Sequence, residues 1–432
     1  MSVHTHCRIC QSPLPEPFLD LGNMPLANAF LSSLEEVATE RSYPLAVTAC
    51  NRCGLVQLNY VVPAEQLYRT YIYFSSTSDA VKRHAAWLSA ELMQRYGWDR
   101  SRLLVEVASN DGTVLKFFQQ IGLRVLGVEP AVNVATAAKA AGVPTLEDFF
   151  NTTTAKEIAT RYGQAACILG RHVFAHVNNL DDFLDGVCTL LADDGVFIIE
   201  VPYLGDLLSD LEFDTIYHEH LSYFALKPIV RLCATHGLHL VDVDRVRLHG
   251  GSMILHMCRA GSSRVASQRL TQMLAQEEML ALDTPETLHR FGTGVLAWRD
   301  QFAGLIAELQ RSGARLVGYG AAAKGNTLLN YCPSAASALE GILDRSPHKQ
   351  GLYTPGTHIL VKPPAYWAES GATHIVILAW NFREEIMRQM DLFAQHGGRF
   401  VVPIPEPKVI SRGFDSAPIP AFAKSTKKSG TF

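Results

Sequence analysis

The sequence predicts an α/β protein in which a small cysteine-containing region precedes two units of alternating strands and helices. Two Cys-x-x-Cys pairs lie near the N-terminus. Two later stretches each run from an apolar strand through a turn of small residues into a helical pattern, the first at residues 103–118 and the second from Ala314. Strands and helices that alternate in this way form parallel sheets, so we expect two Rossmann-like units.

The composition is that of an ordinary globular enzyme. Of the 432 residues, 48% are hydrophobic and 19% are charged, which is enough for several domains with large cores. The net charge of −4 gives no support to a nucleic-acid-binding surface. No apolar run reaches the roughly 18 residues of a membrane-spanning helix, and the first residues lack a signal-peptide pattern. We therefore expect a cytoplasmic monomer or small homo-oligomer that binds neither nucleic acid nor membrane.

Four cysteines form a candidate metal site. Cys7 and Cys10 make one Cys-x-x-Cys knuckle, and Cys50 and Cys53 make a second. Each knuckle places two thiolates on one side of a tight turn, as tetrahedral zinc requires. Residues 11–49 are a longer spacer than a zinc ribbon usually has, so an insertion must fill the gap. Four sulfur ligands leave no coordination position open, and the sequence predicts a structural zinc ion.

The turn after the first strand carries acidic residues where a dinucleotide-binding loop would carry glycines. Carboxylates there would repel a phosphate but attract a cationic cofactor with ribose hydroxyls, which favours S-adenosylmethionine (AdoMet) over NAD. A further acid, Glu129, ends the next strand, where such folds bind ribose hydroxyls. The residues expected to contact AdoMet in these two turns are Glu106, Ala108, Ser109, Asn110, Asp111, Gly112, Glu129 and Pro130.

The strand pattern of the middle region predicts one particular sheet. After the first strand, parallel strands are expected at residues 124–128, 143–145, 165–169 and 195–200. An antiparallel pair at 239–246 and 252–258 is joined by a turn at His249 and two glycines. Five strands closed by an antiparallel pair make the sheet of class I methyltransferases. Further polar residues are expected beyond the carboxyl ends of its strands, where ligands bind: Asp148, Arg171, His172, His176 and Tyr203.

Two polar segments are candidates for chemistry. Between residues 61 and 78, three tyrosines precede a run of hydroxyl side chains, so this segment is either a linker or a lid over the cofactor. Residues 213–224 carry ionisable side chains that cannot all be buried without cost: Asp214, Tyr217, His218, Glu219 and His220. A solvated loop and a metal site are alternatives, although His-x-His is not the spacing of helical zinc hydrolase ligands. We favour a proton-transfer site, because histidine titrates near neutrality and neighbouring tyrosine and glutamate can tune it.

Several motifs occur in one order along nearly the whole chain: the paired knuckles, Val-Glu-Val-Ala-Ser-Asn-Asp-Gly112, Val-Phe-Ala-His176, Glu-Val-Pro-Tyr203, Tyr-His-Glu-His220, His-Gly-Gly-Ser252 and Gly-Tyr-Gly-Ala-Ala-Ala-Lys-Gly-Asn-Thr327. Together they resemble the nucleotide-sugar C-methyltransferases, which methylate 4-keto-deoxysugars at carbon 3, as in tetronitrose and mycarose biosynthesis. The resemblance implies a zinc-binding first domain, an AdoMet-binding middle domain and a last domain that helps to hold a dTDP-sugar. It also implies that His220 is the general base. The residues that it implies around the sugar are Tyr217, Glu219, His176 and Tyr71, with Tyr73 close by.

The second α/β unit carries a rival signal. Its turn, Gly318-x-Gly320-x-x-Ala323, matches the dinucleotide fingerprint, and Asp344 ends the next strand, as in an NAD-dependent oxidoreductase. Lys324 lies in the same turn, before a helix expected from Thr327, and a cation there better suits the pyrophosphate of a nucleotide sugar. The residues expected to bind such a substrate, in addition to the catalytic group, are Tyr73, Tyr203, Lys324, Asn326 and Arg383.

These observations predict four segments and one leading function. We expect a zinc-binding domain at 1–72, a methyltransferase domain at 73–262, a C-terminal Rossmann-like substrate-binding domain at 263–415 and a disordered tail at 416–432. The expected reaction is AdoMet-dependent methylation of a dTDP- or GDP-linked 4-keto-deoxysugar. A base removes the C3 proton, which the C4 ketone acidifies, and the enolate attacks the sulfonium methyl. The alternatives are the NAD-dependent oxidoreductase and a zinc-containing methyltransferase with another acceptor, such as RNA or protein.

Overall fold

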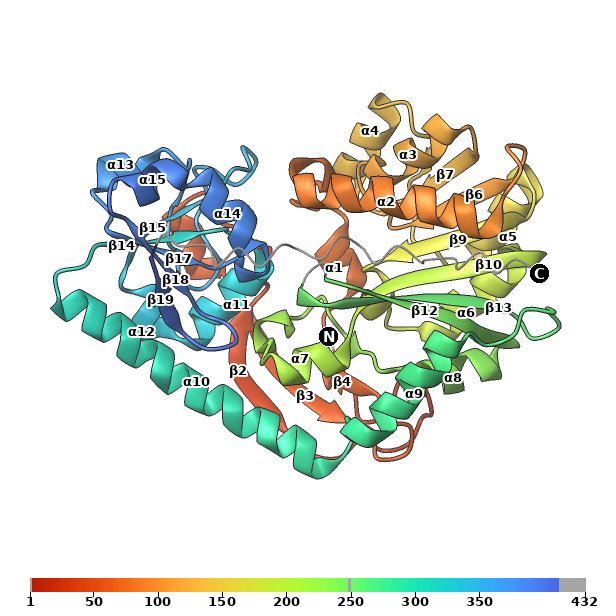
Figure 1. The fold of residues 1–432 in the computed structure, drawn as a ribbon, viewed down its shortest axis with the longest axis horizontal. Coiled ribbons are helices and arrows are strands. Elements are labelled where there is room, and N and C mark those ends of the chain that lie inside the picture. The colour runs from red at the N-terminus through yellow and green to blue at the C-terminus, as the bar shows by residue number, and fades with distance from the viewer. Residues whose placement is uncertain (1, 248–249, 412–432) are drawn as a thin grey trace, which may run out of the picture.

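The structure, a computed structural model, describes residues 2–247 and 250–411, which contain three larger sheets and one two-stranded sheet with helices around them (Figure 1). The predicted turn at His249 and the predicted tail at 416–432 lie outside the described residues. Within the described ranges, no helix is both long and apolar enough to cross a membrane. The expected α/β architecture, with its N-terminal zinc-binding region and two Rossmann-like units, is confirmed.

The N-terminal region forms an antiparallel sheet in the order β11-β4-β3-β2. Its own strands are β2 (Leu19–Pro25), β3 (Ser42–Ala49) and β4 (Val56–Leu58). A separate pair joins β1 (Ser2–Val3) to β5 (Tyr60–Val61). The fourth strand of the larger sheet, β11 (Ser222–Tyr223), comes from the middle of the chain and directly follows the polar segment that we expected to carry the chemistry. The zinc-binding region therefore packs directly against that segment.

The central sheet has the order β12-β13-β10-β9-β6-β7-β8. Its five parallel strands are β6 (Leu103–Val107), β7 (Arg124–Val128), β8 (Thr145–Leu146), β9 (Ala165–Arg171) and β10 (Leu191–Pro202), and β12 (Leu238–Val246) and β13 (Ser252–Arg259) form the antiparallel pair. This is the predicted topology, with β8 starting two residues later and β10 starting four residues earlier than expected.

Alternate residues of the central strands face two helical layers. One layer consists of α2 (Asp79–Tyr96), α3 (Thr113–Ile121) and α4 (Val132–Ala140), which share a buried cluster with Leu104 and Leu169. The opposite layer contains α5 (Thr152–Tyr162) and α6 (Leu180–Leu190). All five residues of β6 are buried, and because β6 is parallel to its neighbours the turn that follows it lies at the carboxyl edge of the sheet, where such folds bind ligands.

The C-terminal unit contains a sheet in the order β16-β15-β14-β17-β18-β19, reached through α9 (Gln268–Leu280) and the long α10 (Pro285–Arg311) (Figure 1). Its strands are β14 (Leu316–Tyr319), β15 (Leu339–Leu343), β16 (Val361–Lys362), β17 (His374–Ile377), β18 (Arg399–Val402) and the antiparallel β19 (Lys408–Ile410). Helix α11 (Ala323–Tyr331) begins four residues before the expected Thr327, so Lys324 and Asn326 lie in its first turn instead of in a loop. Small residues at 321–323 allow the helix to start directly after the glycine turn.

The remaining helices are short and connect these layers. They are α1 (Ala64–Tyr68), α7 (Leu204–Ser209), α8 (Leu226–Thr235), α12 (Pro333–Ala336), α13 (Tyr366–Ser370), α14 (Arg383–Gln389) and α15 (Asp391–Gln395). Short 3₁₀ helices include Leu34–Thr39, Ser75–Thr77, Phe174–His176, Phe213–Thr215 and Trp380–Phe382.

Candidate active site and zinc centre

The four predicted zinc ligands come together in the N-terminal region. The sulfur atoms of Cys7, Cys10, Cys50 and Cys53 all lie within 4.8 Å of one another, with Cys7–Cys53 at 3.5 Å and Cys10–Cys50 at 3.4 Å. A tetrahedral ion with Zn–S bonds of about 2.3 Å would hold its sulfurs about 3.8 Å apart. The cluster therefore fits one zinc ion, whose four thiolates would fill its coordination shell and give it a structural role.

The turn after β6 has an unusual backbone that explains its small residues. Ala108, Asn110 and Gly112 all have positive φ, at 53°, 52° and 73°. A Cβ at position 112 would lie 2.8 Å from the Val143 side chain, so only glycine fits there. The polar backbone of this turn is consequently held close against the end of the sheet.

Glu129 is fixed at the tip of β7 by two backbone N–H groups. Its carboxylate oxygens accept hydrogen bonds from the N–H of Asn110 at 2.8 Å and of Ala131 at 2.9 Å. Burial raises its pKa, and these two N–H donors oppose that rise. A carboxylate held in this way keeps lone pairs for the hydroxyls of a ribose. Pro130, which follows it, is half-buried, and Asp148 lies exposed beyond β8.

Glu106 is buried beneath the same turn. Burial raises its pKa to about 8, and the Arg171 guanidinium opposes this rise. Among the described residues, its Oε2 atom has no hydrogen-bond partner. A buried carboxylate with an unused acceptor is costly unless a ligand satisfies it, and a cationic ligand would do so best.

Arg171 and His172 are anchored on a buried carboxylate, that of Glu200. Arg171 Nε donates to Glu200 Oε2 at 2.8 Å, His84 Nε2 lies 3.0 Å from the same atom, and the His172 backbone N–H donates to the Glu200 carbonyl at 2.7 Å. Burial opposes ionisation of Glu200, but Arg171 and the histidines hold its pKa well below the usual range. We expected Arg171 and His172 to contact AdoMet directly, and this stays a prediction. In the structure both residues bind Glu200, and the Arg171 guanidinium acts on the nearby Glu106.

The segment at 73–76 lies over the turn at 108–112, which we call the AdoMet turn. This position favours the interpretation of the segment as a lid over the cofactor instead of a linker. The backbone N–H groups of Ser75 and Ser76 donate to Asn110 Oδ1 at 2.8 Å and to Asp111 Oδ2 at 3.0 Å. Asn110 Nδ2 returns a bond of 3.0 Å to the Tyr73 carbonyl. Burial raises the pKa of the Tyr73 phenol to about 12, so it stays a hydrogen-bond donor at neutral pH.

His220 is held in one tautomer. Its Nδ1 atom lies 2.7 Å from the Thr215 carbonyl, which can only accept, so Nδ1 carries the proton. Its Nε2 atom lies 2.9 Å from the Tyr217 hydroxyl, which must then donate to it. Burial and the neighbouring His176 keep the pKa of His220 well below the usual value, so the ring is neutral and Nε2 keeps an unprotonated lone pair.

His176 lies beside His220, with ring centroids 5.0 Å apart, and stacks on Tyr68 at 5.5 Å. Burial lowers its pKa to about 3. Its Nε2 atom has no hydrogen-bond partner among the described residues. Two neutral imidazoles therefore lie side by side. Nε2 of His176 is open to a ligand, and Nε2 of His220 accepts from the Tyr217 hydroxyl, which a ligand could displace.

Glu219 is surrounded by donors from distant parts of the chain. Its Oε1 accepts from Asn28 Nδ2 at 2.6 Å, and its Oε2 accepts from the Tyr71 hydroxyl at 3.0 Å. Burial raises its pKa to about 7, while Asn28, Tyr71 and Lys349 oppose the rise. Tyr217, Glu219, His220, His176 and Tyr71 thus come together as the resemblance implied.

The predicted substrate residues lie in different surroundings. Lys324 forms an ion pair with Glu212 at 3.2 Å and lies over the Trp380 ring at 4.8 Å. Trp380 Nε1 donates to the buried Asp214 at 2.7 Å. These contacts join the start of α11 to the catalytic segment, so Lys324 serves the interface between the two units.

Three other predicted substrate residues make no contact with His220 among the residues that the structure describes. Tyr203 packs under the Arg245 guanidinium, 4.3 Å from its ring centroid. Asn326 is buried and donates to the Ala27 carbonyl at 2.7 Å, and Arg383 is exposed at the start of α14. The Tyr203 ring and the Asn326 Nδ2 group therefore have structural contacts, whereas the buried Asn326 Oδ1 has no hydrogen-bond partner among the described residues.

Two residues of the cluster were missed by sequence reasoning. Asn28 belongs to the insertion between the knuckles, and Lys349 follows Asp344 in the C-terminal unit. Lys349 is 7% exposed, and its Nζ donates to the Ala321 carbonyl at 2.6 Å. A polar residue within the apolar stretch at 26–31 was the only sequence signal for Asn28. Nothing local distinguishes Lys349 from a surface lysine.

Comparison with known proteins assigns the family. Family models match residues 7–68 as a zinc binding domain, 81–243 as a methyltransferase domain and 247–405 as the C-methyltransferase C-terminal domain. The C-methyltransferase NovU of Streptomyces niveus is 36% identical over 405 residues, which are 94% of this chain and 96% of NovU. The chain belongs to this C-methyltransferase family. It is accordingly an AdoMet-dependent C-methyltransferase with a structural zinc site, and the NAD-dependent oxidoreductase hypothesis gains no support.

Solved methyltransferases resemble the chain more remotely. Magnesium protoporphyrin IX methyltransferase from Synechocystis PCC 6803 with bound SAM is 12% identical at a TM-score of 0.31, over 41% of this chain and 79% of that one. A SAM-dependent methyltransferase from Anabaena variabilis is 14% identical at a TM-score of 0.33, over 46% of this chain and 100% of that one. At these TM-scores the two structures carry no argument, and the assignment rests on the family models and on NovU.

Proposed function

We propose that this C-methyltransferase transfers the methyl group of AdoMet to carbon 3 of a nucleotide-linked 4-keto-deoxysugar, with dTDP as the first nucleotide to test. The observation that carries the proposal is the state of His220: a buried, neutral imidazole whose Nδ1–H is fixed on Thr215 and whose Nε2 is a proton acceptor. C-methylation requires a carbanion equivalent, and a base of this kind is suited to form one next to a ketone.

In this proposal, Tyr217 and His220 exchange partners when the sugar binds. The substrate separates the Tyr217 hydroxyl from Nε2, which then removes the C3 proton. The Tyr217 hydroxyl donates to the C4 oxygen as negative charge develops there. Burial and the nearby Glu219 hold the pKa of Tyr217 well above the usual value, so it stays a donor. Such positioned donation to an oxyanion is worth about 3 kcal/mol, and positioned proton removal about 10²–10⁴ in rate.

AdoMet, when bound, supplies the sulfonium methyl that the enolate attacks. Glu129 and the 108–112 turn fit its ribose, and Glu106 fits its positive charge. His176 and Tyr71 contact the same cluster as His220 and Glu219, and we propose that they position the sugar ring.

The class of acceptor is supported by one buried cation near Glu219, Lys349. Lys349 is buried and forms no ion pair among the described residues, so it is available to an anionic group of the substrate. Burial lowers the pKa of Lys349, and Asp344 and Glu219 oppose this from beyond ion-pair distance, so the diphosphate of a nucleotide sugar would compensate the buried charge more closely. An uncharged acceptor would leave the cost of that burial in place. The resemblance to nucleotide-sugar C-methyltransferases leads to the same class.

The proposal is tested by incubating the protein with AdoMet and a panel of dTDP- and GDP-linked 4-keto-6-deoxysugars. We expect one sugar to gain the mass of one methyl group and, without AdoMet, to exchange its C3 hydrogen with solvent deuterium. Methyl transfer to oxygen or nitrogen, or to no member of the panel, would refute it.

A variant tests the base separately. His220→Asn should lower both deuterium exchange and methyl transfer by about 10²–10⁴, because both need proton removal. Its AdoMet affinity should stay within about twofold of wild type, as measured by calorimetry. If the variant keeps most of its turnover, His220 is not the base.

A further inference from the structure

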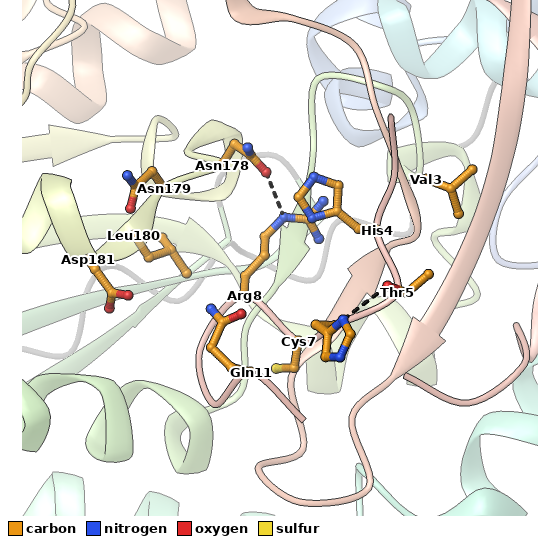
Figure 2. Close-up of a pocket in the computed structure, with 11 residues that line it drawn as sticks. Val3, His4, Thr5, Cys7, Arg8, Gln11, Asn178, Asn179, Leu180 and Asp181 are labelled. Carbon is orange, nitrogen blue, oxygen red and sulfur yellow. Dashed lines mark hydrogen bonds between the residues drawn. The ribbon is translucent and has the colours of Figure 1, made fainter. Parts of the chain in front are cut away.

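Arg8 lies between two zinc ligands, Cys7 and Cys10, yet its side chain runs away from the sulfur cluster. Figure 2 shows the guanidinium pointing from the knuckle toward Asn178. The side chain is 5% exposed, and among the described residues it forms no ion pair with a carboxylate. Burial of a guanidinium that only neutral oxygens bind costs free energy. This cost suggests that the donors of Arg8 have a role in the geometry of the site.

The donors of Arg8 reach two catalytic segments at once. Its Nη1 donates to the Leu221 carbonyl at 3.3 Å and to the Leu58 carbonyl at 2.8 Å, and its Nε donates to Asn178 Oδ1 at 3.3 Å. Leu221 directly follows His220, and Asn178 is two residues beyond His176. One planar group thus bridges the segments that carry both histidines.

The same two segments are also joined to each other and to the zinc-binding sheet. The Leu221 N–H donates to the Ala175 carbonyl at 2.8 Å, and the Leu221 carbonyl accepts from the Leu58 N–H at 3.0 Å. Gln57 Oε1 accepts from both the Arg8 backbone N–H at 3.1 Å and Nη1 at 3.0 Å, which fixes the start of the side chain. The knuckle backbone, the guanidinium and the histidine segments therefore form one continuous hydrogen-bonded unit.

We propose that Arg8 is a positioning residue, through which the zinc knuckle holds the His176 and His220 segments at their working separation. Zinc would fix the backbone at Cys7 and Cys10, Nη1 and Nε of Arg8 extend that constraint to Leu221 and Asn178, and the two imidazoles follow. A displacement of about 1 Å in such a site can lower the rate about 100-fold. The role goes beyond keeping the N-terminal region folded, because it acts on the geometry of the proton-transfer pair.

The test compares Arg8→Gln with Arg52→Gln. Arg52 lies between the other two zinc ligands but is exposed, so it controls for any change to a knuckle arginine. Arg8 borders a cleft of about 470 Å³, so the shorter side chain can be hydrated instead of leaving a sealed void. Arg8→Gln should keep its zinc and its AdoMet affinity, but amide hydrogen exchange across 174–178 and 215–223 should become about 10-fold faster. Arg52→Gln should change neither.

Methyl transfer provides the second readout, measured with whichever panel sugar the wild-type protein methylates. Arg8→Gln should lower kcat about 10- to 100-fold with KM for AdoMet unchanged. Asn178→Ala, at the exposed end of the bridge, should act in the same direction and add little in the double variant. Loss of zinc from Arg8→Gln, unchanged exchange in both segments, or a wild-type kcat would each overturn the proposal. The exchange measurement needs no acceptor, so it decides the positioning role even if the proposed substrate class is wrong.

Discussion

At the scale of single residues, the site is defined by what burial does to its acids and bases. Burial raises the pKa of Glu106 to about 8 and of Glu219 to about 7, and lowers that of His176 to about 3. In each case the charged form is the one that burial disfavours. The histidines are therefore kept as neutral acceptors, while the two glutamates titrate within the working pH range.

Glu106 should make AdoMet binding depend on pH. The ligand is cationic, so it prefers the ionised carboxylate, which becomes the main form only above pH 8 in the ligand-free protein. If AdoMet binds the ionised form, the affinity of the wild type should rise about 30-fold between pH 6.5 and pH 9, with a proton released on binding at the lower pH. Calorimetry in buffers of different ionisation enthalpy measures both. Glu106→Gln should show neither effect, and a wild-type affinity independent of pH would contradict this role.

Glu219 should shape the pH–rate profile. Its two oxygens both accept hydrogen bonds, from Asn28 and Tyr71, which suits the ionised form. The ionised carboxylate holds the Tyr71 hydroxyl and adds to burial in raising the pKa of Tyr217, the partner of His220, so its charge acts on the site. We expect kcat/KM to rise as pH increases through about 7 and then to level off. In Glu219→Gln the rise of kcat/KM near pH 7 should disappear, and the constant value of kcat/KM at higher pH should fall about 10- to 100-fold. A rise that persists near pH 7 in the variant would assign it to another group.

At the scale of elements, the sequence predicted those helices, strands and turns whose formation depends on neighbouring residues. The strand–turn–helix at 103–118, the two knuckles and the hairpin strands all depend on apolar periodicity and on small residues, which are visible in a short window. The start of α11 was misplaced by four residues because Gly318 and Gly320 suggested a longer loop, whereas the alanines after them continue into the helix.

The partners of the site could not be predicted in this way. Lys324 was expected to face a pyrophosphate, yet it pairs with Glu212, more than 100 positions earlier in the chain. Asn28 meets Glu219 only because the insertion between the knuckles folds back over the catalytic segment. A side chain's chemistry is set by the groups around it, and those groups come from all three parts of the chain.

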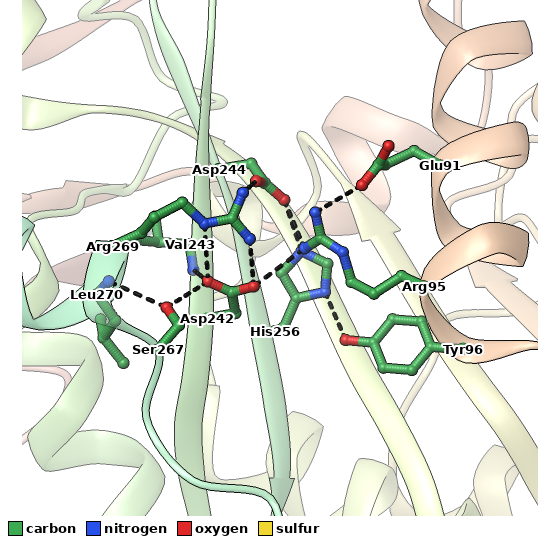
Figure 3. Close-up of polar contacts among 10 residues, drawn as sticks. All are labelled: Glu91, Arg95, Tyr96, Asp242, Val243, Asp244, His256, Ser267, Arg269 and Leu270. Atoms are coloured by element: carbon green, nitrogen blue, oxygen red, sulfur yellow. Dashed lines mark hydrogen bonds and ion pairs between the residues drawn. The ribbon is translucent and has the colours of Figure 1, made fainter. Parts of the chain in front are cut away.

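A second charged network stabilises the outer hairpin of the central sheet, away from the histidine cluster. Figure 3 shows Asp244 of β12 between Arg95 of α2 and Arg269 of α9. Asp244 accepts from Arg95 at 2.7 Å, from Arg269 at 2.5 Å and from His256 Nε2 at 3.1 Å. Burial opposes its ionisation, but His256 and Arg95 lower its pKa below the usual value. The network therefore joins two helices to the edge of the sheet.

Asp244→Asn should lower the stability of the fold without changing the rate of methyl transfer. A carboxyl group with a lowered pKa in the folded state stabilises the protein above its unfolded pKa, and this contribution is lost as pH falls through the folded pKa. At pH 7 the full effect is present, and we expect a loss of about 1–3 kcal/mol in urea denaturation. Asp193→Asn, at a fully exposed side chain, should change stability by less than about 0.5 kcal/mol. Equal stabilities of the two variants would show that the network contributes nothing.

At the scale of the whole molecule, the N-terminal insertion acts as a spacer between the two Rossmann-like units. Leu31 and Tyr353 exchange backbone hydrogen bonds of 2.9 and 2.8 Å, and Glu40 pairs with His358 at 2.8 Å. The lid residue Phe74 stacks on His348, with ring centroids 4.7 Å apart. The C-terminal unit is thereby held against both the catalytic segment and the lid over the AdoMet turn, which brings Lys349 to the Glu219 side of the site.

Lys349→Met should separate binding of the acceptor from binding of the cofactor. The methionine fills a similar volume beside Phe30 but removes the positive charge. Burial already lowers the pKa of the Lys349 ammonium group. If Lys349 binds the anionic part of a nucleotide sugar, KM for the sugar should rise about 10- to 100-fold, which is the loss of one charge-assisted contact. The AdoMet affinity should remain unchanged.

Lys362→Met provides the control, because Lys362 belongs to the same unit but lies over the Tyr366 ring at 5.0 Å, outside the cluster around Glu219. Its kinetic constants should equal those of wild type. A rise in KM should also depend on the nucleotide: the free sugar without its diphosphate should react equally slowly with the wild type and with Lys349→Met. If instead the variant lowers kcat at saturating sugar and leaves KM alone, Lys349 acts on Glu219 during the reaction and the anion-binding role is wrong.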